Sequence, residues 1–243
     1  MQPARHEPVS RRNRPAKPAL TKAGIIATAV RVMRAEGLER VTMRRLATEL
    51  DTGPASLYVY VANTAELHAA ILEELLGEVD LSPAADHDQG GASGGPDGVG
   101  DWRERMDAVL GSYSRVLDEN PGLARSALVA RPTGPNYLSL LEALLTLLDE
   151  GGVPDDRAAW GVDILLLVAT ASVVEHAGHG DQGPGSAEWN SLATALEEAS
   201  PTATPHVAAL GSALMSGTPH LRRKWAIRML LEGTEHTPLP TAD

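Results

Sequence analysis

The segment from Thr42 to Leu67 constrains the fold of this chain more than any other stretch of the sequence. Thr42 suits the N-cap of a helix, and the apolar residues after it repeat at helical spacing: Leu46, Ala47 and Leu50. Asp51, Thr52 and Gly53 interrupt this pattern. Pro54 then suits the first turn of a new helix, where its missing N–H has no partner to lose. The pattern predicts two short helices joined by a tight turn, a helix-turn-helix arrangement.

A third helix is predicted to follow, because Asn63 and Glu66 have the spacing of a capping box. The stretch from Thr21 to about Val79 resembles the N-terminal domain of TetR-family transcriptional repressors, closest to the tetracycline-repressor branch. Three runs carry the resemblance: Gly37-x-x-x-Val41-Thr42-Met43-Arg44-x-Leu46-Ala47, Pro54-Ala55-Ser56-Leu57-Tyr58-x-Tyr60-Val61 and Asn63-x-x-Glu66-Leu67. In two places the chain departs from the family pattern. Asp51 stands where the turn usually has Gly, although Asp tolerates the left-handed conformation, and Thr64 replaces the usual Lys.

The resemblance implies a double-stranded DNA operator as partner and a set of DNA-contacting residues at the two helix starts: Thr42, Arg44, Arg45, Pro54, Ala55, Ser56, Tyr58, Tyr60 and Thr64. Ser hydrogen-bonds to several bases, and Pro and Ala offer apolar contact to a thymine methyl group. Two alternatives stay open. The arginine pair is also explained as a solvated helix face, and one of the two tyrosine hydroxyls as a group that completes the small core.

Charge is distributed unevenly along the chain. Residues 1–50 carry 11 Lys and Arg against 4 Asp and Glu, whereas the rest carries 10 against 28. Since neutralisation of phosphate charge is local, the basic end favours nucleic-acid binding even though the whole chain is acidic. Residues 1–20 are rich in Pro and basic residues and lack an apolar signal segment, which predicts a disordered basic arm.

Behind the predicted DNA-binding domain (21–67), the sequence predicts a connecting helix (68–81), a flexible linker or insertion (82–100), a helical body (101–233) and a tail (234–243). The expected fold class is all-α: a three-helix DNA-binding domain followed by a ligand-binding and dimerisation domain. Because the linker is rich in Gly, signals are expected to pass between connecting helix and body.

The helix expected over 155–177 is apolar almost all round between Ile164 and Val174. Such a helix must be covered on every side, and this apolar core is too short to span a membrane. We therefore expect a homodimer, with an interface that also uses the last helix (219–232): Leu167, Val168, Ala171, Trp225 and Met229.

The resulting functional expectation is a cytoplasmic, ligand-responsive repressor that binds a palindromic operator as a dimer and is released by a largely apolar effector. The alternative is an architectural or non-inducible DNA-binding protein. No enzyme activity is expected, because the chain has no cysteine and lacks phosphate-loop and G-x-S-x-G motifs. No cofactor or metal is expected either, since His176 and His179 lack a clear third ligand. Several aromatic and histidine residues remain equally good candidates for the effector pocket: Trp102, Tyr113, Tyr137, Trp160 and His176.

Overall fold

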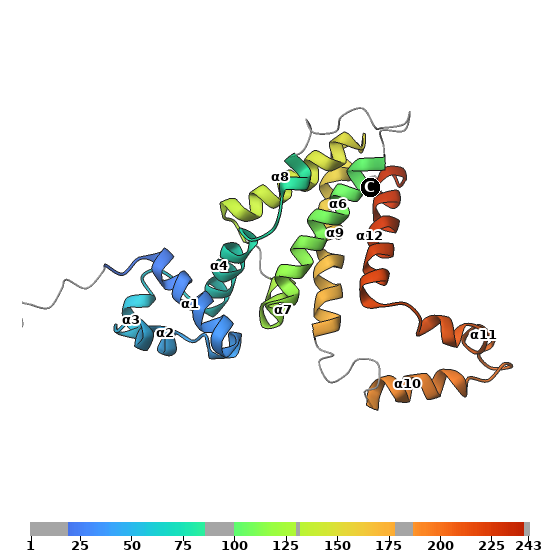
Figure 1. Cartoon of the computed structure of the whole chain (residues 1–243), viewed down its shortest axis with the longest axis horizontal. Helices are drawn as coiled ribbons and strands as arrows, with labels where there is room; N and C mark the ends of the chain where they lie inside the picture. Colours follow the sequence, from blue (N-terminus) through green and yellow to red (C-terminus); the bar gives the residue numbers. More distant parts are fainter. Residues whose placement is uncertain (1–18, 86–99, 130–131, 178–186, 241–243) are drawn as a thin grey trace, which may run out of the picture.

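The computed structural model describes residues 19–85, 100–129, 132–177 and 187–240, and within these ranges the regular elements are all helices (Figure 1). The expected all-α fold is confirmed. The elements are α1 (Lys22–Glu36), η2 (Leu38–Arg40), α2 (Met43–Glu49), α3 (Pro54–Leu57), α4 (Thr64–Leu76), α5 (Ser82–Ala85), α6 (Gly100–Asp118), α7 (Pro121–Ala127), α8 (Pro135–Glu150), α9 (Asp155–Ala177), α10 (Ala187–Glu197), α11 (Pro205–Leu214) and α12 (Pro219–His236).

The helix ends of the N-terminal head follow the local sequence signals. The Thr42 hydroxyl accepts a hydrogen bond from the Arg45 amide at 3.1 Å, and the Asn63 side chain accepts one from the Glu66 amide at 2.9 Å. The Glu66 carboxylate completes the predicted capping box one residue earlier than usual, on the amide of Ala62. Asp51 has a φ of 47°, so it takes the left-handed conformation expected at this turn.

The body is built around α9, which packs against α6, α7, α8 and α12. The head is joined to this body by α4, whose buried side chains face both α1 and the body helices α6, α7 and α8. Figure 1 shows α4 between the two parts, with the α10–α11 pair extending away from the body on the opposite side. The position of α4 makes it the main mechanical connection between head and body.

Two predicted domain boundaries need correction. Ser82–Ala85, assigned to the flexible linker, forms the short helix α5, because Ala84 is buried and the helix packs on α6 and α8. The last helix does not end before a tail at 234 but continues to His236. Arg103 forms an ion pair with Glu235, and Arg157 donates to the Glu235 carbonyl, which holds this last turn against the body. The remaining linker residues (86–99), the arm up to residue 18 and the end of the tail (241–243) lie outside the described residues.

By length and composition alone, α9 could cross a membrane, which the expectation from its short apolar core did not anticipate. In the structure it is the central helix of the body, and less than half of this stretch is buried within one chain.

Candidate DNA-binding face and ligand cavity

The start of the recognition segment is open to solvent. Pro54, Ala55 and Ser56 are exposed, while Leu57, one residue further on, is completely buried in the head. Leu57 therefore anchors the short helix α3 and leaves the three preceding side chains on the surface. Thr42 and Thr64 are exposed as well, at the N-termini of α2 and α4. This arrangement offers a surface of small side chains that can approach base edges closely.

Arg44 and Arg45 are adjacent in sequence but have different environments. Arg45 is half-buried, and its guanidinium binds Glu36 and Glu49 at 2.6 Å each. These hydrogen bonds lower the pKa of both carboxyl groups and raise that of Arg45. Arg44 is exposed, and among the described residues its guanidinium forms no ion pair. Of these two arginines, Arg44 is therefore the one whose positive charge is available to an incoming phosphate or base.

The two recognition-segment tyrosines also separate. Tyr60 is partly buried, and its hydroxyl donates to the Leu20 carbonyl at 2.9 Å, which ties the chain before α1 to the recognition segment. Tyr58 is 53% exposed. Of the two explanations left open by the sequence, the geometry gives Tyr60 the role of completing the small core, and it leaves Tyr58 facing solvent.

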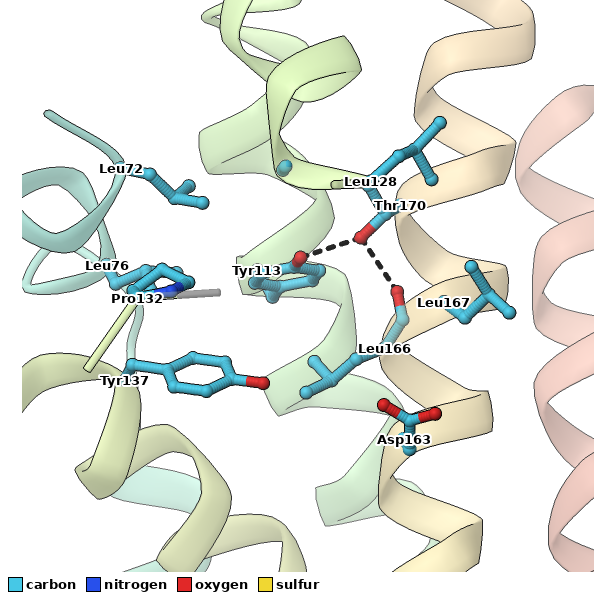
Figure 2. A pocket seen from close by; sticks show the side chains of 11 residues that line it. Leu72, Leu76, Tyr113, Leu128, Pro132, Tyr137, Asp163, Leu166, Leu167 and Thr170 are labelled. Carbon is cyan, nitrogen blue, oxygen red and sulfur yellow. Dashed lines mark hydrogen bonds between the residues drawn. The ribbon is translucent and has the colours of Figure 1, made fainter. Parts of the chain in front are cut away.

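A small cavity of about 70 Å³ lies in the body at the junction with α4. Figure 2 shows it between Leu72 and Leu76 of α4, the rings of Tyr113 and Tyr137, and α9. The further lining residues are Ala127, Leu128, Pro132, Asp163, Leu166, Leu167 and Thr170. Most of these side chains are apolar, with polar groups at a few points, as is typical of ligand pockets in proteins.

The polar groups of the cavity have a defined direction. The Thr170 hydroxyl donates its single proton to the Leu166 carbonyl at 2.7 Å, so the Tyr113 hydroxyl, 2.7 Å from Thr170, must be the donor in that pair. The remaining lone pairs of Tyr113 can then accept from a ligand. Burial raises the pKa of Tyr113, which keeps the phenol protonated at neutral pH.

The cavity distinguishes the aromatic candidates that are equivalent in the sequence. Tyr113 and Tyr137 line it, whereas Trp102 is buried against Gly151 and Trp160 is exposed on α9 without lining the cavity. The side chain of His176 lies outside the described residues. Leu72, Leu76 and Thr170 were not among the candidates. Their helical periodicity indicated only core packing, and no local signal distinguishes a cavity wall from a core position.

The helices α9 and α12 also carry large apolar side chains that are exposed in the single chain. We call this set the outer apolar face: Trp160, Ile164, Leu167, Leu221, Trp225 and Met229. These residues recur every three or four positions on two helices that pack side by side. Of the other predicted interface residues, Ala171 is exposed and Val168 is half-buried. Leu167 reaches both this face and the cavity.

Family models match both parts of the chain. The model for bacterial regulatory proteins of the tetR family matches residues 25–71, and that for the tetracyclin repressor-like C-terminal domain matches residues 95–236. The chain therefore belongs to the TetR family of transcriptional regulators, and its head is the helix-turn-helix DNA-binding domain of that family.

Several relatives lie close in sequence and structure. A proposed transcription regulator of Streptomyces coelicolor, SCO7704, is 49% identical, with a TM-score of 0.74 over 93% of this chain and all of that one. Apo ActR of the same organism is 30% identical, with a TM-score of 0.74 over 89% of this chain and 97% of that one. Among curated proteins, the transcriptional repressor DrrR1 of Streptomyces coeruleorubidus is 32% identical over 60% of this chain and 49% of DrrR1. The chain thus spans about half the length of that relative.

Proposed function

We propose that this protein is a cytoplasmic transcriptional repressor that binds a palindromic operator as a homodimer and is released by a small, largely apolar effector. The observation that carries the proposal is the position of Leu72 and Leu76. Both belong to α4, the helix that bears the head, and both line the cavity in the body. A ligand in this cavity would contact the helix that sets the position of the DNA-binding segment.

The head provides the DNA contacts in this proposal. We assign them to the exposed residues at the helix starts and the recognition segment: Thr42, Arg44, Pro54, Ala55, Ser56, Tyr58 and Thr64. Arg45 and Tyr60 are assigned to the scaffold instead, because each is already bonded inside the head. Arg44 then supplies the main electrostatic contact from α2.

The outer apolar face supplies the dimer interface. Six large apolar side chains exposed on two adjacent helices are more than a monomeric surface ordinarily leaves uncovered. A two-fold axis would pair this face with itself and place the two heads on the same side of the DNA. The domain expected over 101–233, extended to His236, is accordingly the effector-binding and dimerisation unit.

The effector class follows from the cavity lining. Its walls are mainly leucine and tyrosine, and among the described lining residues Asp163 is the one charged group. A neutral or basic ligand with an apolar body and a hydrogen-bond donor for the Tyr113 oxygen fits this lining better than an acidic one. One solved structure of the relative ActR is a complex with actinorhodin, which shows that a similar fold accommodates a small-molecule ligand.

The proposal is tested first by selecting the DNA sequence that the protein binds. Duplexes selected from a random pool by the wild-type protein should contain an inverted repeat. Titration of small hydroxylated aromatic compounds, actinorhodin among them, should release this DNA in a gel-shift assay. Leu76→Trp, which fills the cavity from α4, should make DNA binding insensitive to every active compound while dimerisation persists. Selection of DNA without a repeat, or release that is insensitive to Leu76→Trp, would contradict the proposal.

A non-inducible DNA-binding protein is the second candidate. The small size of the cavity, about 70 Å³, favours it, since drug-sized ligands occupy pockets of roughly 300–1,000 Å³. The same selected duplex distinguishes the two. A non-inducible protein binds the repeat but is not released by any compound of the series.

A further inference from the structure

Glu73 of α4 directly follows the cavity residue Leu72 in the sequence, and it joins α4 to the body. Its carboxylate accepts hydrogen bonds from the Asn136 amide at 2.7 Å and from the Tyr137 amide at 3.3 Å. The Asn136 side chain returns a hydrogen bond to the Glu73 carbonyl at 2.9 Å. Three hydrogen bonds therefore join α4 to the first turn of α8, 63 or more residues away in the sequence.

With this contact, every backbone N–H in the first turn of α8 has a hydrogen-bond acceptor. Pro135 has no N–H, the Asn136 and Tyr137 amides bind Glu73, and the Leu138 amide binds the Gly134 carbonyl at 3.2 Å. Gly134, at the N-cap position, has no side chain that could accept a hydrogen bond from these amides. A carboxylate from α4 thus replaces the N-cap of α8, where the helix dipole also favours a negative charge.

The close approach of Glu73 depends on Gly134. A Cβ atom at Gly134 would lie 2.4 Å from both Cδ and Oε1 of Glu73, far inside contact distance. The backbone angles of Gly134 are in the ordinary extended region, so the glycine is required for space and not for its conformation. The sequence Gly134-Pro135-Asn136 is therefore shaped to receive a carboxylate from α4.

The turn held by Glu73 carries a wall of the cavity. Tyr137, whose amide binds Glu73, places its ring in the cavity, with its hydroxyl directed across toward α9 (Figure 2). With a volume of about 70 Å³, the cavity must enlarge before it admits a molecule of the proposed class. Among the aromatic walls, Tyr113 is fixed by its hydrogen bond to Thr170, whereas the Tyr137 hydroxyl has no hydrogen-bond partner among the described residues. Tyr137 is the wall that is less firmly held.

We propose that Glu73 is the positioning residue that couples the cavity to the DNA-binding head. This inference rests on the proposed function. Displacement of Tyr137 by a ligand moves the first turn of α8, and the Glu73 carboxylate transmits this movement to α4 and so to the head. A ligand can then favour one head position by binding better to the state in which Tyr137 is displaced.

The experiment uses a distance within one chain and needs neither effector nor operator. The chain has no cysteine, so cysteines introduced at exposed Ala35 in α1 and exposed Glu142 in α8 can carry spin labels. Labelled chains are mixed with an excess of unlabelled chains, so that pulsed electron–electron double resonance reports the distance between head and body within one subunit. Ala127→Phe fills the cavity and serves as a built-in ligand, with Ala127→Leu as the substitute if circular dichroism shows that the Phe variant does not fold.

With Glu73 present, we expect Ala127→Phe to shift the mean distance by about 1–2 Å, the size of helix shifts in allosteric proteins. The shift should disappear in Glu73→Ala and also in Gly134→Ala, which displaces the carboxylate without removing it. It should persist in Glu74→Ala, the exposed neighbour on α4. Faster hydrogen exchange at the Asn136 and Tyr137 amides verifies that the contact is broken.

Two results would overturn the proposal. The first is a shift that survives in Glu73→Ala although the two amides exchange faster, because Glu73 would then be only a helix cap. The second is the absence of any shift with Glu73 in place. Failure of the wild-type protein to select a DNA sequence would instead count against the proposed function, and the distance measurement does not depend on that outcome.

Discussion

The hydroxyl groups of Tyr113 and Thr170 lie 2.7 Å apart in the body, and they connect α6 to the central helix α9 at the wall of the cavity. The hydrogen bond is buried, so water cannot replace it freely when one of the two hydroxyl groups is removed. Tyr113→Phe should lower the free energy of unfolding by about 1 kcal/mol. Urea denaturation at one fixed protein concentration measures this change in free energy, because dimer stability depends on concentration.

Tyr137→Phe is the matched control for Tyr113→Phe, since the Tyr137 hydroxyl has no hydrogen-bond partner among the described residues. Equal losses for both variants would contradict the assignment.

Removing the charge of Arg44 and removing that of Arg45 should have different effects on DNA binding. Arg44→Ala should weaken binding to the selected duplex and reduce the slope of log K against log salt by about one unit if Arg44 contacts a phosphate. Arg45→Ala should leave that slope unchanged and instead loosen the packing of α2 on α1, because it loses the ion pairs to Glu36 and Glu49. Fluorescence anisotropy over a range of salt concentrations distinguishes the two. A salt slope that falls only in Arg45→Ala would reverse the assignment.

The outer apolar face should fail as an interface when a charge is placed in it. Trp225 is 66% exposed in the single chain and does not line the cavity, which makes it a cleaner test than Leu167. Trp225→Glu would bury an unpaired carboxylate at a cost of several kcal/mol and should yield monomers. Leu138→Glu, at a leucine on α8 that is 58% exposed, is the control and should remain dimeric. Multi-angle light scattering at micromolar concentration reports the mass. A monomeric wild-type protein would refute the interface.

His68 should make the junction between α4 and α7 sensitive to acid. Its Nδ1 lies 3.1 Å from the Ser126 hydroxyl, and burial lowers its pKa below the ordinary 6.5. Between the lowered pKa and 6.5, the unfolded chain binds more protons than the folded one. The contribution of His68 to stability is therefore complete above about pH 7 and decreases as the pH falls through the folded-state pKa.

The measurement is the free energy of unfolding at several pH values between 7.5 and about 5. His68→Gln should show a smaller loss on acidification than the wild type, while His220→Gln, at an exposed position on α12, should follow the wild type. Identical pH profiles for the wild type and His68→Gln would show that the imidazole does not contribute.

Local signals in the sequence were sufficient for most element boundaries. The N-caps Thr42 and Asn63 act on amides three residues away, and Asp51 takes its left-handed conformation within a single turn. The last turn of α12 could not be placed in the same way, because the ion pair of Glu235 with Arg103 spans the whole body domain. Likewise, the pattern before the Gly-rich segment gave no sign of α5, whose stability depends on burial of Ala84 against other helices.

Local sequence patterns are enough to predict the all-helical class, the helix-turn-helix, the family and the unusually apolar helix α9, because each depends on residues a few positions apart. The packing of the helices assigns different roles to side chains that are chemically equivalent in the sequence. Arg45 is committed to Glu36 and Glu49 while Arg44 is not, and Tyr113 and Tyr137 line a cavity that Trp102 and Trp160 do not reach. The physical reason is range: a helix cap is satisfied within one turn of its own chain, whereas the partner of a buried hydroxyl or a carboxylate such as Glu73 is set by packing between helices more than 50 residues apart.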